Sequence, residues 1–514
     1  MRHLRNLRFA PALIALLAGM AQAVSIAAPW NGEPQWWLQL FSLAVLAWLL
    51  QRAATWRESA AVAWVFTTAW LAGTWWWLFI SLHVYGGLVA PLAAIAVLLL
   101  AGLLAIYYAA TCGVAWFAKG RGAIVQSIAF ASAWLLGELM RASFFTGFPW
   151  GASGYAHVDG PLAILAPVIG VYGIAATGAF LSWWLAALVR PSMRVPPRSR
   201  IVVAGVVMLL AACNFFARPG EEAASRKLSV ALLQGNIPQD EKFQGGTGVP
   251  VALDWYARQL TESRASLTVT PETAIPLLPL ELPRGYEATL AAPFAQGTRA
   301  ALIGIPLGSL EDGYSNSVVG LAPGAKAYRY DKHHLVPFGE FIPPLFKWFV
   351  RLMNIPLGDF NRGAVVQAPF IWAGERLSLN ICYEDLFGED LALQFADPAR
   401  APTIFVNVSN IAWFGDSVAI DQHLAISRMR AIEFDRPVIR ATNTGATAII
   451  DHRGQVTHSL PRLTRGVLTG DVEGRTTITP YAAWMSRLGL WPLWALALAA
   501  MAAGVFRRRE RPHP

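Results

Sequence analysis

The sequence predicts two structural parts, a helical part that spans a membrane several times and an α/β domain. Only 14% of the 514 residues are charged and the mean hydropathy is +0.42, whereas soluble domains average about 25% charged residues. Several apolar stretches approach the ~20 residues that a helix needs to cross a bilayer. Residues 226–472 differ, because charged residues, Pro and Gly are frequent there and short Val- and Ile-rich runs recur.

We predict eight membrane spans, seven before the polar segment and one after it. The predicted spans are residues 9–28, 36–51, 60–82, 88–116, 123–140, 162–188, 201–217 and 488–505. The second is short and the fourth is long, so tilt or a kink is expected there.

Basic residues are confined almost entirely to alternate loops. The short loops on one side of the membrane hold a single basic residue, Arg141, whereas those on the other side hold fifteen. Lys and Arg are enriched in cytoplasmic loops. This pattern predicts cytoplasmic termini and an outward-facing polar segment. The net charge of +9 is then a topology signal and requires no nucleic-acid partner. The other side holds Arg2, Arg5, Arg8, Arg52, Arg57, Lys119, Arg121, Arg190, Arg194, Arg198, Arg200, Arg507, Arg508, Arg509 and Arg511.

The N-terminus allows two interpretations. A basic start, an apolar stretch and A-Q-A at 21–23 resemble a cleavable signal peptide. The apolar run continues through residue 28, and the alternation of loops holds with the first span retained. We therefore favour an uncleaved anchor.

The polar segment has the pattern of an α/β domain. Runs such as L-S-V-A-L-L-Q, S-L-T-V-T, A-L-I-G-I and T-I-F-V-N-V, bounded by turn residues, predict strands. Residues 248–265 and 419–434 are predicted helices between them. Alternating strands and helices over this length predict one domain with its own core.

Cys382 ends one of these strand-like runs, L-S-L-N-I-C-Y-E-D. Cys112 and Cys213 lie in long apolar runs, so the polar segment has no second cysteine to pair with, although an outward-facing domain favours disulfides. A buried cysteine that acts as a small hydrophobe is the commoner case. A position at a strand end, before Glu384 and Asp385, instead favours a nucleophile, which requires a base because free thiols are mostly protonated.

Glu272 is the candidate base, because T-P-E-T follows the run S-L-T-V-T. Alone it would be interpreted as a solvated loop residue. Beside Cys382, a partly buried carboxylate with a raised pKa could accept the thiol proton.

Lys332, in Y-D-K-H-H, follows a further strand-like run. Alone it would be a surface lysine, but near a thiol its ammonium would stabilise an oxyanion. His333 and His334 lack the spacing of zinc ligands, so we expect no metal. Glu340 could orient Lys332 or shield the site.

The motifs P-E-T, Y-D-K-H-H-L-V-P-F-G-E and N-I-C-Y-E, in this order, resemble the Glu–Lys–Cys motifs of the nitrilase (carbon–nitrogen hydrolase) superfamily. R-A-T-N-T-G at 440–445 fits as well. With G-F-P-W at 147–150 and the predicted spans, nearly the whole chain is similar to the bacterial apolipoprotein N-acyltransferase family. The resemblance implies a seven-span domain (1–222), a periplasmic nitrilase-like α-β-β-α sandwich (223–475) and a C-terminal anchor with a basic tail (476–514), in the bacterial inner membrane.

The resemblance also implies roles for individual residues. Glu272 would be the base, Lys332 the oxyanion stabiliser and Cys382 the nucleophile. One departure is Phe243, where the family pattern has Trp, which leaves any hydrogen bond from an indole N–H in doubt. Further positions that match the family's motifs near the site are Asn316, Glu340, Tyr383, Glu384 and Trp413, the last in a loop implicated in substrate handling.

The implied reaction is ping-pong acyl transfer without a cofactor. A membrane phospholipid would acylate Cys382, and the N-terminal amine of diacylglyceryl-cysteine on an apolipoprotein would accept the acyl chain. The apolar segment 341–353 would be an arm at the membrane interface or a core helix. Glu138 and Arg141, near the outward end of the fifth span, could pair one turn apart or contact a lipid headgroup.

Two other functions are open to such a chain. One is a membrane-tethered amidase or nitrilase that acts on a small amide. The other is a transporter or scaffold with an inactive hydrolase domain. Spans that are nearly free of charge and show no repeat argue against the transporter.

Overall fold

The computed structural model describes residues 2–188, 205, 227–342 and 360–506. The chain forms two compact units. Met1–Trp76, Pro91–Gly220 and Leu488–Pro514 make the first, and Trp77–Ala90 with Glu221–Arg487 make the second. A short piece from between two apolar helices thus belongs to the unit that holds the sheets.

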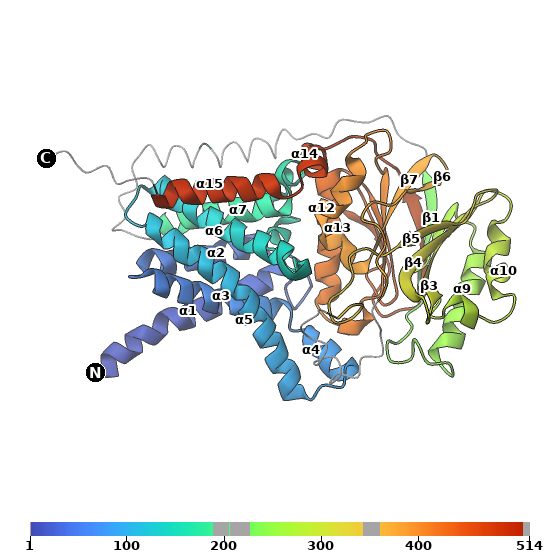
Figure 1. The fold of residues 1–514 in the computed structure, drawn as a ribbon, viewed down its shortest axis with the longest axis horizontal. Coiled ribbons are helices and arrows are strands. Elements are labelled where there is room, and N and C mark those ends of the chain that lie inside the picture. The colour runs from blue at the N-terminus through green and yellow to red at the C-terminus, as the bar shows by residue number, and fades with distance from the viewer. Residues whose placement is uncertain (1, 189–204, 206–226, 343–359, 507–514) are drawn as a thin grey trace. The chain divides into compact units, whose positions relative to one another are not determined.

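The first unit is a bundle of apolar helices (Figure 1), in which α1 packs on α2 and α3, and α6 packs on α7 and α15. The helices are α1 (Arg2–Ile26), α2 (Trp36–Arg52), α3 (Trp56–Thr74), α5 (Ala90–Ala115), α6 (Ala123–Ser143), α7 (Ala166–Leu188) and α15 (Trp491–Phe506), with short turns η2 (Trp116–Ala118), η3 (Phe144–Thr146), η4 (Ser153–His157) and η5 (Pro161–Leu165).

These helices make the chain a membrane protein. Among the described residues, Ala90–Ala118, Ala123–Thr146 and Pro161–Leu188 are long and apolar enough to span a bilayer. The number rises to 5 if two helix pairs with short breaks each count as one span. The count of eight stays a prediction, and the predicted span 201–217 lies outside the described residues.

The predicted span over 60–82 contains a break between Thr74 and Leu78, and that its two pieces together cross the membrane stays a prediction. Helix α3 ends at Thr74, and α4 (Leu78–Ile80) with the π-helical turn η1 (Ser81–Tyr85) belongs to the second unit. There the Trp77 Nε1–H donates to Gln422 Oε1 at 3.0 Å, and the Trp77 ring packs on Phe414 at 4.2 Å between centroids. The hydropathy pattern did not reveal this break, because the tryptophans around it continue the apolar run.

Glu138 and Arg141 form an ion pair one turn apart on α6, so the pairing interpretation is confirmed. The two groups are 2.6 Å apart and both side chains are wholly buried. Arg141 also donates to the carbonyls of Phe148 and Trp150. The pair therefore holds the G-F-P-W loop against α6, and its burial leaves no room for a lipid headgroup.

The second unit contains two six-stranded sheets. The first has the order β12-β1-β2-β3-β4-β5 and the second the order β11-β10-β9-β8-β7-β6. Pairs β1–β2, β2–β3, β7–β8 and β8–β9 are parallel. The strands are β1 (Leu228–Gln234), β2 (Leu267–Val269), β3 (Ala300–Ser309), β4 (Gly313–Leu321), β5 (Tyr328–Asp331), β6 (Phe370–Trp372), β7 (Glu375–Ile381), β8 (Ile404–Ser409), β9 (Val438–Thr442), β10 (Ala448–Ile450), β11 (Val456–Ser459) and β12 (Gly466–Val472).

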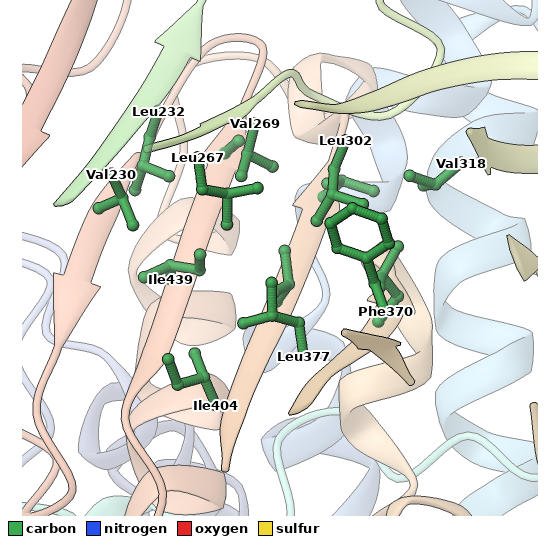
Figure 2. Close-up of a cluster of buried hydrophobic side chains, with 14 of the residues drawn as sticks. Val230, Leu232, Leu267, Val269, Leu302, Val318, Phe370, Leu377, Ile404 and Ile439 are labelled. Carbon is green, nitrogen blue, oxygen red and sulfur yellow. The ribbon is translucent and has the colours of Figure 1, made fainter. Parts of the chain in front are cut away.

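The sheets pack face to face through one apolar core (Figure 2), in which Val269 and Leu302 of the first sheet face Leu377 and Ile439 of the second. Helices cover both outer faces (Figure 1), so the predicted α-β-β-α sandwich is confirmed. The helical elements are α9 (Gly248–Glu262), η6 (Pro279–Glu281), α10 (Tyr286–Ala291), η7 (Ala292–Phe294), η9 (Cys382–Leu386), α12 (Gly388–Ala392), η10 (Leu393–Phe395), η11 (Ile411–Phe414), α13 (Ala419–Phe434) and α14 (Pro480–Leu488).

Candidate active site

Three strand ends bring the predicted Glu, Lys and Cys together. Cys382 directly follows β7, Lys332 directly follows β5, and Glu272 lies just beyond β2. The Lys332 Nζ donates to Glu272 Oε1 at 3.1 Å, and the charges of both residues act on the Cys382 thiol. The carboxyl ends of buried strands thus place all three groups in one site of the sandwich.

Glu272 is held by three donors. Its Oε1 accepts from Lys332 and from Asn316 Nδ2 at 2.7 Å, and its Oε2 accepts the backbone N–H of Asn410 at 2.7 Å. The expected raised pKa was wrong. Burial does act to raise the pKa of Glu272, but the ammoniums of Lys332 and Lys242 and the Asn316 amide lower it further. Glu272 is therefore ionised at rest.

Lys332 lies between two carboxylates. Its Nζ donates to Glu340 Oε1 at 2.8 Å as well as to Glu272, and Glu340 Oε2 accepts the Val336 N–H at 2.8 Å. Burial acts to lower the pKa of Lys332, yet Glu272 and Glu340 raise it above its ordinary value. Lys332 stays charged, and the contacts of Glu340 are those of a residue that orients it.

Asn316 joins the two carboxylates. Its Nδ2 donates to Glu272 Oε1 at 2.7 Å and to Glu340 Oε1 at 2.8 Å. Carboxylates only accept, so the amide nitrogen, and not the oxygen, must face them. One amide thereby holds both acids around the Lys332 ammonium.

Cys382 is half-buried and has a left-handed backbone, with φ of 52°. That conformation costs a residue with a side chain roughly 1–2 kcal/mol, so neighbouring groups must hold it. Burial and then the Glu272 carboxylate raise the pKa of the Cys382 thiol to about 12, while Lys332 lowers it. At neutral pH the resting group is a thiol.

A buried polar cluster holds the Cys382 carbonyl. A guanidinium only donates, so at 3.1 Å from Arg440 Nη2 the His423 Nδ1 must accept. His423 therefore carries its proton on Nε2, which donates to the Cys382 carbonyl at 3.1 Å and to Asp385 Oδ1 at 3.0 Å. Sequence reasoning missed His423, which looks like an ordinary helical residue of α13.

Glu384 connects the ends of β5 and β7. Its carboxylate accepts the backbone N–H groups of His333 and Ile381, each at 2.7 Å, and the Tyr330 hydroxyl at 2.9 Å. It also accepts the His334 N–H at 3.2 Å. Glu384 thus fixes the spacing between the strand ends that carry Lys332 and Cys382.

Tyr383 and Trp413 lie at the margins of this arrangement. Tyr383 is buried and packs its ring against His334 at 5.8 Å. Trp413 is half-buried in η11 and lies edge-on to Tyr85 at 5.8 Å. This turn starts next to Asn410, whose N–H holds the Glu272 carboxylate. Trp413 is therefore connected to the Glu272 carboxylate through the backbone of this turn.

Lys242 is the second residue that sequence reasoning missed. It is 2% exposed, and its Nζ donates to the main-chain carbonyl of Glu272 at 3.1 Å. Its neighbour Phe243 is 47% exposed. A single lysine in a loop looks like a surface residue, so only the motif around Phe243 could have drawn attention to it. The predicted arm at 341–353 lies almost entirely outside the described residues.

The described residues contain no group of three or more His, Cys, Asp or Glu side chains placed to hold a metal ion. The chemistry that the site can support is that of a thiol, a carboxylate and an ammonium: attack on a carbonyl carbon, with proton transfer and oxyanion stabilisation.

A Glu–Lys–Cys site at the strand ends of a double-sheet sandwich defines a carbon–nitrogen hydrolase domain, and residues 229–481 match the family described as Carbon-nitrogen hydrolase. Residues 18–184 match the family described as Apolipoprotein N-acyltransferase N-terminal domain. The Apolipoprotein N-acyltransferase of Verminephrobacter eiseniae is 57% identical over 496 residues, which cover 93% of this chain and 92% of that protein. That of Ralstonia nicotianae is 43% identical over 514 residues, covering 99% and 95%. The chain belongs to the apolipoprotein N-acyltransferase family.

Proposed function

We propose that this protein transfers an acyl chain from a membrane phospholipid to the N-terminal amine of diacylglyceryl-cysteine on apolipoproteins, through a thioester on Cys382. The observation that carries the proposal is the buried ion pair of Glu272 and Lys332 beside a half-buried thiol. Its presence in a chain with apolar spans favours a substrate that resides in the bilayer.

The first half-reaction forms the thioester. Sγ of Cys382 attacks the ester carbonyl carbon of the phospholipid as its proton moves to a Glu272 oxygen, and Lys332 stabilises the oxyanion. Because the pKa of the thiol is about 12 and that of Glu272 is lowered, little free thiolate forms beforehand. Proton transfer therefore accompanies the attack. Collapse breaks the carbon–oxygen ester bond, and Glu272 returns the proton to the departing lysophospholipid.

The second half-reaction forms the amide. The α-amine of the lipoprotein attacks the thioester carbonyl carbon, and Glu272 accepts a proton from the nitrogen. The oxyanion again lies beside Lys332, and its collapse breaks the carbon–sulfur bond and returns the proton to Cys382. The same three groups serve both halves, as ping-pong transfer requires.

The proposed location is the bacterial inner membrane, with both termini in the cytoplasm and the catalytic domain in the periplasm. The distribution of Lys and Arg over alternate loops supports this topology. A periplasmic site would meet lipoproteins after their export.

Intact-protein mass spectrometry of the purified full chain, incubated with phospholipid in detergent micelles, tests the proposal. The wild type should gain the mass of one acyl chain, Cys382→Ala should gain none, and Glu272→Gln should gain it much more slowly. An adduct of undiminished yield on Cys382→Ala would refute the nucleophile. Release of ammonia from a small amide, without any acyl adduct from lipid, would favour a hydrolase instead.

A further inference from the structure

Lys242 is a second buried lysine beside the Glu272–Lys332 pair. It lies in the loop between β1 and α9, and its ammonium donates to the main-chain carbonyl of Glu272 at 3.1 Å. Burying an ammonium is costly unless opposite charge lies close to it. The buried ammonium of Lys242 is therefore stabilised by the negative charges of the surrounding acids.

One cation is not enough for the acids around Cys382. The carboxylates of Glu272 and Glu340 both contact Lys332, and the charge of Glu384 interacts with the same ammonium. After burial itself, Glu272 and Glu340 are the groups that raise the pKa of the thiol. Any negative charge in the site that Lys332 does not neutralise makes it less favourable to form a thiolate on Cys382 or an oxyanion beside it.

Lys242 lies where a second positive charge offsets this excess. Its charge interacts with that of Glu272 and with that of an ionised Cys382. Moving the thiol proton to Glu272 leaves the two lysines with the carboxylate of Glu340 and the new thiolate, so the charges of these four groups balance. Glu384 adds a negative charge near Lys332, and Arg440, which pairs with Asp385, adds a positive charge that also interacts with an ionised Cys382. Without Lys242, the same transfer would occur in a site with a surplus negative charge.

We propose that Lys242 is a positioning residue of the catalytic centre, which holds the Glu272 loop by its carbonyl and supplies the second positive charge that lets Cys382 ionise. The inference rests on the proposed function only in taking Glu272 as base and Cys382 as nucleophile. Its test reads the thiol directly and needs neither lipid nor lipoprotein.

The role of Lys242 has a pH signature. Burial lowers the pKa of Lys242 to about 8, although Glu272 and Cys382 act to raise it. Glu272 contacts both lysines, Lys242 through its main-chain carbonyl and Lys332 through its carboxylate. On the loop of Lys242, Asp240 is exposed and Glu241 half-exposed. Below a pH of about 8 the charged Lys242 favours the thiolate, and above it this support is progressively lost.

The experiment measures the alkylation rate of Cys382 by iodoacetamide, followed at the level of the Cys382 peptide, in the detergent-solubilised full chain between about pH 6 and 10. The variants are Lys242→Met, which removes the charge at similar volume, and Lys242→Arg, which retains a charge throughout this range. Lys227→Met is the matched control, because Lys227 belongs to the same unit and its side chain is 67% exposed.

For the wild type we expect the logarithm of the rate to rise with pH up to about 8, to flatten over about one pH unit as Lys242 loses its proton, and then to rise again. Lys242→Met should react about tenfold more slowly near neutral pH, equivalent to about one unit in the thiol pKa, and should rise without flattening. Lys242→Arg should keep most of the neutral-pH rate and lose the flattening. Lys227→Met should behave as the wild type.

Two outcomes would overturn the inference. One is a wild-type profile for Lys242→Met. The other is a lower rate with the flattening retained in either variant, because a purely structural defect changes the rate without changing the pH at which it bends. Failure of acyl transfer from phospholipid, with the alkylation profiles as expected, would refute the proposed function and leave the role of Lys242 standing.

Discussion

Replacing Asn316 by Asp reverses the polarity of the group that joins the two carboxylates of the site. The Asn316 amide donates to Glu272 Oε1 at 2.7 Å and to Glu340 Oε1 at 2.8 Å. An aspartate side chain has the same shape, and the backbone carbonyl of this residue can still accept the Lys332 N–H at 2.8 Å. The substitution therefore tests the two side-chain hydrogen bonds with little change in packing.

The expected loss follows from the strength of these bonds. A hydrogen bond to a charged group contributes about 1.5–3 kcal/mol, so losing two costs roughly 3–6 kcal/mol. If most of this appears in the barrier to acylation, the rate falls about 10²- to 10⁴-fold at neutral pH. Lowering the pH should restore part of the rate relative to the wild type, because the introduced carboxyl, once protonated, can donate to one of its two neighbours.

The assay is the rate of acyl-adduct formation by intact-protein mass spectrometry across a pH series. Asn316→Leu should be slow at every pH, since it cannot regain a donor. Asn361→Asp, an exposed site in the same unit, is the matched control and should react as the wild type. An Asn316→Asp rate within a few-fold of the wild type at neutral pH would refute the reasoning that the amide holds the two carboxylates together.

Substitutions at three further positions test other parts of the structure. A Cβ at Gly304 would lie 2.1 Å from the Pro271 carbonyl oxygen, so Gly304→Ala should displace the loop of the base and slow acyl-adduct formation; a normal rate would contradict this contact. His423→Gln retains a donor toward the Cys382 carbonyl and His423→Leu does not, so Cys382 should be alkylated faster in the Gln variant; equal rates would show that this bond is unimportant. Leu379 is buried between the sheets, so Leu379→Ala should lower the free energy of unfolding by about 2–5 kcal/mol, measured by thermal or denaturant unfolding; a change below about 0.5 kcal/mol would contradict its placement.

Much of the fold could be predicted because its signals are local. Helix α13 begins and ends at the predicted residues, 419 and 434, and α9 begins at the predicted residue 248 and ends at Glu262. The strand-like runs before Lys332 and Cys382 form β5 and β7. Buried strands and apolar helices are recorded in consecutive residues, so hydropathy and turn residues are enough to find them.

The break after α3 could not be predicted in this way. Trp75 and Trp77 extend the apolar run, yet Trp77 belongs to the second unit and donates to Gln422, 345 positions along the chain. A hydropathy pattern records how apolar a segment is and contains no information about which distant residue it meets.

The chain alone determined which residues carry the chemistry, since a thiol, a carboxylate and an ammonium each follow a strand-like run and their motifs occur in a characteristic order. Only the tertiary structure decided their electrostatic state. Glu272 has a lowered rather than a raised pKa because Lys332 and Lys242 both act on it, and the Asn410 N–H reaches its carboxylate across 138 positions of sequence. A pKa depends on the distances to every nearby charge and donor, and those distances exist only once the strands have paired and the two sheets have packed.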